Sequence, residues 1–560
     1  DIDGVVVTGG GDQTINAQNG FQVLNSTGSI TNSTVQNIGY AGGAVAYSGL
    51  FLLYQNTGLL IDGNTITGVN NVNANAKSVG VFVVDFGPDS SGVTITNNAI
   101  SQTDIGIDAS GGYTPNGVDI SGNTFTDLDT SDPFHQGVSL DPDATAAVFN
   151  AVGSTYADTL KGGSSADTFD GLAGADTIDG RGGADVLLGG AGDDSITGGA
   201  GGDDMDGGDN SDTYTVSSVS DFAGDDIDDT GASGTDTLLL NGASAESFVI
   251  GSGNTGLEAV TISSSANIDV DASAVGNALT ITGDTGANAI VGTAFGDTIN
   301  TGDGNDTVTG GAGSDTMNGG NNTDTAVFTG AYDDYTFGGT ASALTVSDGV
   351  DTDAVNNFEF ITLADGTFAT SELFAAVKVF NGTTFIGGFN TIQAGVNAAL
   401  DGYKVVVAAG TYTEQVVVDG KTDLQIIADG AVTLKAPADV IETVRSSSDR
   451  ELHGVLTVKN STNVTVDGLT VDGDGRANTV DEGGGAGQAN YVGVVYRNAS
   501  GELIDVDVTG VRDPYPGGTT PGTGDLLVSG VQRGVGIQVD NDTLLSFKMT
   551  GGSISDFQKN

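Results

Sequence analysis

The nine residues Gly189-Gly-Ala-Gly-Asp-Asp-Ser-Ile-Thr197 are one copy of a block that occurs seven times in register between residues 153 and 215. Each block approximates Gly-Gly-x-Gly-x-Asp-x-U-x, in which U is a large hydrophobic residue. The sixth positions are Asp158, Asp167, Asp176, Asp185, Asp194, Asp203 and Asp212. The eighth positions are Leu160, Phe169, Ile178, Leu187, Ile196, Met205 and Tyr214. A flexible glycine-rich linker would not place a hydrophobic residue at every ninth position, so this period predicts a packed roll of short strands.

The residue types at these positions indicate calcium binding. Glycines permit tight turns with positive φ that bring carbonyl oxygens inward, and the aspartates add the hard anionic oxygens that calcium prefers. Two blocks are expected to make one coil, so each aspartate should stack on the aspartate eighteen residues later. Without a cation, carboxylates roughly 5 Å apart repel one another. Folding and calcium binding are therefore predicted to be one event.

A second array runs from residue 283 to residue 327, and its sixth positions are Asn288, Asp297, Asp306, Asp315 and Asp324. Its first and last blocks are degraded, as terminal repeats that cap a stack tend to be. Blocks such as Gly310-Gly-Ala-Gly-Ser-Asp-Thr-Met-Asn318 resemble the repeats-in-toxin (RTX) family of secreted bacterial proteins. The resemblance implies an extracellular or cell-surface location and export by type I secretion. The predicted metal ligands are the seven aspartates of the first array and the four of the second.

The composition of the chain limits the classes of molecule that it can bind. The chain has 16 Lys and Arg against 73 Asp and Glu, a net charge of −57, which excludes nucleic acid and anionic membranes as direct partners and favours divalent cations. Cysteine is absent, so we expect metal ions to stabilise the fold in place of the disulfides found in many extracellular proteins. The sequence contains no apolar run of about 18 residues, so it predicts no membrane-spanning helix. Short strand-like runs without long helical periodicity indicate an all-β class.

The flanks of the arrays carry a looser repeat. The segments 58–67, 92–101 and 117–126 align with one another, as expected for coils of a right-handed parallel β-helix. Asn64, Asn98 and Asn123 share one register within them and are interpreted as a structural asparagine ladder at a coil corner.

The C-terminal segment has the features of a β-helix opening. Residues 390–400 place Ile392, Val396 and Ala399 on one face of a short helix, which predicts a cap over the core. This helix and the turn Gly410-Thr-Tyr-Thr-Glu414 resemble the pectate-lyase-like superfamily.

The predicted fold is therefore all-β, with calcium-bound parallel β-rolls flanked by two portions of right-handed parallel β-helix. The predicted parts are the following: 1–150, C-terminal coils of a split β-helix; 151–216, first roll; 217–282, strand-rich connector; 283–327, second roll; 328–376, strand-rich closing segment; 377–560, N-terminal cap and first coils of a β-helix. The first coil begins without a cap and the last ends without one. We therefore expect a head-to-tail homo-oligomer, or one period of a longer tandem array.

Catalytic residues are sparse. The superfamily resemblance implies a polysaccharide lyase or mannuronan epimerase as the enzymatic alternative, which would need a bound metal and a basic residue in one groove. The best cluster for this is Asp472, Asp474, Arg476, Tyr491 and Arg497, together with Tyr496, Arg512 and Asp513. The element Asp132-Pro-Phe-His135 departs from the epimerase pattern by an inserted Phe, and His453 is interpreted as a coil residue.

The favoured hypothesis is a non-enzymatic, calcium-dependent extracellular structural repeat protein that assembles end to end into a filament, surface layer or adhesin stalk. Two alternatives stay open beside it. One is the lyase or epimerase, and the other is a non-catalytic adhesin that binds a cell-surface or matrix polysaccharide.

Overall fold

The computed structural model describes residues 1–8, 20–24, 26–38, 46–54, 56–68, 76–83, 91–103, 105–110, 116–126, 128, 136–141, 148–231, 233–474, 490–511 and 534–556. The chain divides into two compact units, residues 1–324 and residues 325–560. Both units are built almost wholly of β-strands, and many of these pair in parallel in long sheets, as the sequence predicts for β-helices and β-rolls. No helix in the described ranges is long and apolar enough to cross a membrane.

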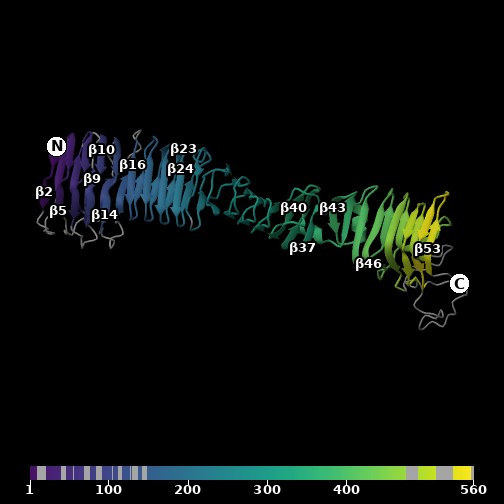
Figure 1. Cartoon of the computed structure of the whole chain (residues 1–560). Coiled ribbons are helices and arrows are strands. Elements are labelled where there is room, and N and C mark those ends of the chain that lie inside the picture. The colour runs from purple at the N-terminus through teal and green to yellow at the C-terminus, as the bar shows by residue number, and fades with distance from the viewer. Residues whose placement is uncertain are drawn as a thin grey trace. The chain divides into compact units, whose positions relative to one another are not determined.

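The first coils of unit 1 have three strands each. In one such coil these are β7 (Leu59–Asp62), β8 (Thr65–Gly68) and β9 (Ala76–Val83). Each strand pairs in parallel with its counterparts in the neighbouring coils, for example β10 (Ser91–Thr96), β11 (Ala99–Ser101) and β12 (Ile105–Ser110). The stacked ladders are visible in Figure 1 between β2 (Val6–Thr8) and β16 (Asn150–Ser154). These coils form the expected parallel β-helix.

The coils then narrow to two strands. The last described strand of the second sheet is β14 (Thr124–Thr126), whereas the other two sheets continue into the first roll. There the strands alternate between the sheets: β17 (Thr159–Lys161), β18 (Thr168–Leu172), β19 (Thr177–Asp179), β21 (Val186–Ala191), β22 (Ser195–Thr197), β24 (Asp204–Asp209) and β25 (Thr213–Val216). The register joins residues eighteen apart, such as Phe169 with Leu187. The predicted two-block coil is confirmed.

One core runs through the β-helix, the first roll and the connector. The hydrophobic eighth positions of the first array are at most 1% exposed. The sheet that holds β25 continues through β27 (Thr237–Leu240), β29 (Ala259–Ile262), β31 (Thr280–Thr282) and β33 (Thr298–Asn300). The connector is therefore a stretch of the same solenoid with longer loops. The other strands of the second roll in unit 1 are β32 (Ala289–Val291), β34 (Thr307–Thr309) and β35 (Thr316–Asn318).

Unit 2 opens with β36 (Thr325–Val327), which pairs with β40 (Phe360–Leu363). An antiparallel meander follows in sequence, made of β37 (Thr336–Thr340), β38 (Ala343–Ser347) and β39 (Thr352–Asn356). Beyond it, β44 (Lys404–Thr413), β46 (Gln425–Lys435) and β49 (Val464–Asp472) stack in parallel as the first face of a second β-helix. A second face consists of β45 (Val416–Asp419), β48 (Glu451–Lys459) and β50 (Asn490–Arg497).

The predicted helical cap of this second β-helix is α1 (Ile392–Ala398). Ile392, Val396 and Ala399 are each at most 1% exposed, so the predicted apolar face is confirmed. The Glu414 carboxylate accepts the backbone N–H groups of Ile392 at 2.8 Å and Gln393 at 2.9 Å. The expected turn at Gly410–Glu414 is instead the end of strand β44 and the residue that follows it, and its glutamate serves the helix, because the first N–H groups of a helix have no partner within the helix.

Candidate metal centre

The aspartates of the nonapeptide blocks form two hydrogen-bonded ladders in the first roll, one on each side. Each aspartate lies directly before a strand and is at most 2% exposed. One oxygen, Oδ1, accepts the backbone N–H of the ladder residue in the preceding coil, as Asp176 does from Asp158 and Asp194 from Asp176, both at 2.7 Å. The second ladder repeats this bond from Asp167 to Asp185 at 2.7 Å. The predicted stacking at eighteen residues is therefore present.

The other carboxylate oxygen, Oδ2, lacks a donor at the interior positions. It is buried without a hydrogen-bond partner in Asp176, Asp185, Asp194, Asp203 and Asp212 of the first array and in Asp306 of the second. Asp158, Asp167 and Asp297 differ, because they accept at Oδ2 from the N–H groups of Ser154 at 2.6 Å, Gly163 at 2.7 Å and Thr293 at 2.6 Å. A buried acceptor without a donor is costly unless a cation or a proton reaches it.

In the middle blocks of the first roll, the first glycine forms a cradle for this orphaned oxygen. A Cβ built on Gly171 would collide with Oδ2 of Asp176 and with the carbonyl oxygen of Gly189 in the next coil. The same pair of acceptors converges over Gly180 and Gly189. Two oxygen acceptors that face one space, with no side chain between them, match the carboxylate and carbonyl ligands that calcium takes. The residues present therefore fit calcium.

The environment favours the protonated form of these carboxylates in the absence of a cation. Burial raises the pKa of Asp176 to about 8, and the neighbouring Asp158 adds to the shift. Burial likewise raises the pKa of Asp158, Asp185 and Asp212 to about 7. Calcium would replace these protons on binding.

The second array repeats the arrangement with one informative change. Asp297 and Asp306 accept at Oδ1 from the backbone N–H groups of Leu279 at 2.7 Å and Asn288 at 2.8 Å. Asp315 and Asp324 accept in the same way from Asp297 and Asp306. At Asn288 the amide nitrogen donates to the carbonyl oxygen of Ile268 at 2.8 Å. The asparagine side chain therefore donates its own N–H to a carbonyl oxygen of the preceding coil.

The ladders continue into the connector, beyond the residues that the nonapeptide period identifies. Asp225 accepts from Asp203 at 3.0 Å, and Asp236 accepts from Asp212 at 2.8 Å. The nine-residue spacing missed both because the loops before them are longer. A shorter signal finds them: in Asp225-x-Ile227 and Asp236-x-Leu238 the acidic residue again comes two positions before a fully buried hydrophobic residue.

Comparison with known families gives the same result for the arrays. The sequence model of the RTX calcium-binding nonapeptide repeat (4 copies) matches residues 152–187, 179–214 and 291–326. Both arrays are RTX repeats. RTX repeats bind calcium and imply an extracellular or secreted protein. No curated protein matched the chain.

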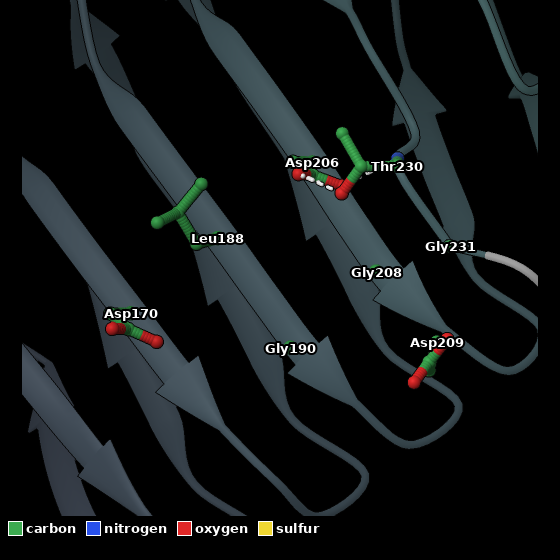
Figure 2. A pocket seen from close by; sticks show the side chains of 8 residues that line it. All are labelled: Asp170, Leu188, Gly190, Asp206, Gly208, Asp209, Thr230 and Gly231. Carbon is green, nitrogen blue, oxygen red and sulfur yellow. Dashed lines mark hydrogen bonds between the residues drawn. The ribbon is translucent and has the colours of Figure 1, made fainter.

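The first RTX roll carries a pocket on its outer surface. Figure 2 shows the residues that line it on β18, β21, β24 and the segment after β26 (Asp226–Ile227): Asp170, Leu188, Gly190, Asp206, Gly208, Asp209, Thr230 and Gly231. Its volume is about 350 Å³, and no lysine or arginine is among these residues. An acidic surface without a basic group does not favour an anionic sugar as its ligand.

The candidate catalytic cluster is only partly brought together. Asp474 pairs with Lys435 at 3.1 Å, and Asp472 accepts the backbone N–H of Asp474 at 2.8 Å. Tyr491 is fully buried and donates its hydroxyl to the carbonyl oxygen of Gly473 at 2.6 Å. Arg497 donates to the carbonyl oxygen of Arg445 and pairs with Asp542, both at 2.9 Å. Tyr491 and Arg497 thus have structural partners in this arrangement.

Of the remaining candidate catalytic residues, the structure describes only His453 and the buried Tyr496. Arg476, Arg512, Asp513 and the element 132–135 lie outside the described residues. His453 is 8% exposed in β48, and its Nδ1 lies 3.1 Å from the carbonyl oxygen of Val440. This is the coil position that the sequence predicts. The enzymatic hypothesis and the pectate-lyase-like relationship stay predictions.

Proposed function

We propose that this chain is a calcium-dependent extracellular structural repeat protein in which the RTX rolls are rigid only when calcium is bound. The observation that carries the proposal is the row of buried aspartates whose Oδ2 atoms face carbonyl oxygens of the next coil without any donor. Calcium in these positions would bond to two coils at once and cancel the repulsion along each ladder.

The solenoid construction supports a structural role for the rolls. In the first roll each described coil pairs with its neighbours, so rigidity is transmitted along the stack from one coil to the next. The coils next to the first roll share its core, as the pairing of β16 with β18 shows. Loss of calcium would therefore soften the roll between segments that remain folded. Such a segment suits a spacer that becomes stiff in millimolar extracellular calcium.

The proposal is tested by small-angle scattering and electron microscopy of the full chain, first in millimolar calcium and then after calcium removal. A rigid elongated particle in calcium that becomes shorter and flexible without it is the expected result. An unchanged particle in both conditions would refute calcium-dependent stiffness. Filaments seen only in calcium would also support the predicted end-to-end association. Monomers in both conditions would refute that association, and turnover of alginate and pectate would then be assayed to test the enzymatic alternative.

A further inference from the structure

Three buried carboxylates meet where the first roll joins the connector. Asp212 ends the first array, whereas Asp229 and Asp236 belong to the connector and stand outside every nonapeptide block. The three residues are 1%, 8% and 5% exposed, respectively. Each offers one carboxylate oxygen to a group whose members all lie within 4.8 Å of one another. Three like charges at this separation in a buried place need a compensating positive charge.

Among the described residues, no lysine or arginine supplies that charge. In the part of the chain that the structure describes, none of the three carboxylates forms an ion pair with a lysine or arginine. Oδ2 of Asp212 is buried and has no hydrogen-bond partner, although Oδ1 of the same residue accepts the N–H of Asp194 at 2.7 Å. An unpartnered oxygen on a side chain this deeply buried points to a ligand that is bound here.

The second carboxylate is held in place by neighbours from the last nonapeptide block and from the connector. The hydroxyl group of Tyr214 donates to Oδ2 of Asp229 at 2.7 Å and accepts the backbone N–H of Gly207 at 2.6 Å. The N–H of Gly231 donates to Oδ1 of Asp229 at 3.0 Å. The third carboxylate, Asp236, accepts the N–H of Asp212 at 2.8 Å, which fixes it beside the first. Hydrogen bonds of this kind orient ligand groups around a metal.

We propose that Asp212, Asp229 and Asp236 form a separate calcium site that closes the first roll against the connector. It differs from the repeat sites because two of its carboxylates, Asp229 and Asp236, come from outside the nonapeptide blocks and join Asp212 of the last block. Calcium bonds to oxygen at about 2.3–2.6 Å, so oxygens up to about 5 Å apart can share one ion. Magnesium needs a smaller octahedron with ligands at about 2.0–2.1 Å and usually keeps several waters, which fits a buried cluster of three carboxylates less well.

The loop that carries Asp229 also borders a surface pocket. Thr230 and Gly231 follow Asp229 directly and line the surface pocket shown in Figure 2, where Thr230 donates its hydroxyl to Asp206 at 2.7 Å. The acidic groups of this pocket would attract a hydrated cation to the loop that carries Asp229. The site does not depend on the proposed mechanical role, since it concerns one ion at one junction.

The first experiment counts calcium ions on the full chain by native mass spectrometry. Asp229→Asn keeps an oxygen acceptor for Tyr214 and lies outside the RTX blocks, so we expect it to bind one calcium ion fewer than the parent. The matched control is Asp204→Asn, which removes the same charge from an exposed side chain of the same roll. An unchanged count in Asp229→Asn, with the control also unchanged, would overturn the site while leaving the repeat sites in place.

The second experiment uses terbium as a luminescent substitute for calcium, with excitation of tyrosine because the chain has no tryptophan. Tyr214 contacts Asp229, so its ring should transfer energy to an ion held there. We expect Tyr214→Phe to lose part of the emission while all three carboxylates remain, and Tyr156→Phe serves as the tyrosine control. Equal emission from Tyr214→Phe and the parent would contradict the proposal even if Asp229→Asn failed to fold.

Discussion

The asparagine ladder of the β-helix and the aspartate ladders of the first roll solve the same packing problem with different chemistry. In both, the ladder residue lies two positions before a core residue, as in Asn98-x-Ile100 and Asp176-x-Ile178. In both, the side-chain Oδ1 accepts a backbone N–H of the preceding coil. Asn98 accepts in this way from Asn64 at 3.0 Å, and Asp176 accepts from Asp158 at 2.7 Å.

The two ladders differ at the second side-chain atom. The amide nitrogen of Asn98 donates to Oδ1 of Asn123 at 2.9 Å and to the carbonyl oxygen of Ile61 at 3.0 Å, so the predicted asparagine ladder is confirmed and closes on itself. The corresponding atom of Asp176 is an oxygen without a donor. Exchange of one nitrogen for one oxygen therefore converts a self-sufficient ladder into one that needs a cation.

The residue five positions earlier reinforces this difference. It is Gly171 for Asp176, and the absence of a Cβ leaves room for the converging oxygens. For Asn98 it is Val93, which is fully buried. In this β-helix coil, a hydrophobic side chain fills the position that a glycine leaves open for an ion in the roll.

Removal of calcium should produce the largest difference in stability between the aspartate ladders and the asparagine ladder. At a hundredfold excess over its Kd, each bound ion stabilises the folded state by about 2.7 kcal/mol, so several sites together rival the stability of a domain. We expect hydrogen exchange to become fast in residues 153–215 after chelation, while the asparagine-ladder coils at 59–68 and 91–103 stay protected. Equal loss of protection in both segments would show that the two ladders do not differ in their need for metal.

The substitution Asn98→Asp should convert one step of the asparagine ladder into the other chemistry. The new oxygen would face the Ile61 carbonyl oxygen without a donor, which is expected to cost about 3 kcal/mol. Because Val93 leaves no room for an ion, calcium should not restore the loss. Thermal unfolding of the variant in calcium and in chelator measures this, with Asn98→Ser as a control that removes the amide without adding charge. Recovery in calcium would mean that the glycine cradle is unnecessary.

The opposite exchange, Asp185→Asn together with Asp203→Asn, places amides in the roll. We expect the variant to bind one calcium ion fewer and to be about 2–3 kcal/mol less stable in calcium, the contribution of one well-occupied site. In chelator it should be at least as stable as the parent, because each amide has a donor to give to a carbonyl oxygen, as Asn288 does. An unchanged calcium count by native mass spectrometry would sink the assignment of these two residues.

The sequence predicts the ladders better than it predicts where they end. The nonapeptide period identifies the aspartates of both arrays, and the shared register of Asn64, Asn98 and Asn123 identifies the asparagine ladder. Asp229 has no such signal, because the residue two positions after it is Gly231 and its place in the cluster depends on the Tyr214 hydroxyl. A contact between side chains on different coils follows from loop conformation, which periodicity does not encode.

The smallest effect is expected from pH, because a proton neutralises a carboxylate without bridging two coils. In calcium-free protein, burial raises the pKa of Asp176 to about 8 and that of Asp185 to about 7, from 3.8 when unperturbed. The folded roll therefore binds more protons than the unfolded chain between about pH 4 and pH 8, and its stability should fall as the pH rises through that range.

Calcium should reverse this trend, since it binds the deprotonated form. Denaturant unfolding of protein freed of calcium by exhaustive dialysis, at pH 5, 6, 7 and 8, checks the sign. The double variant Asp185→Asn and Asp203→Asn should show a shallower decline than the parent, because it has two fewer titrating groups in one ladder. A calcium-free roll that gains stability from pH 5 to pH 8 would mean that its buried carboxylates find donors that the ladder geometry does not provide.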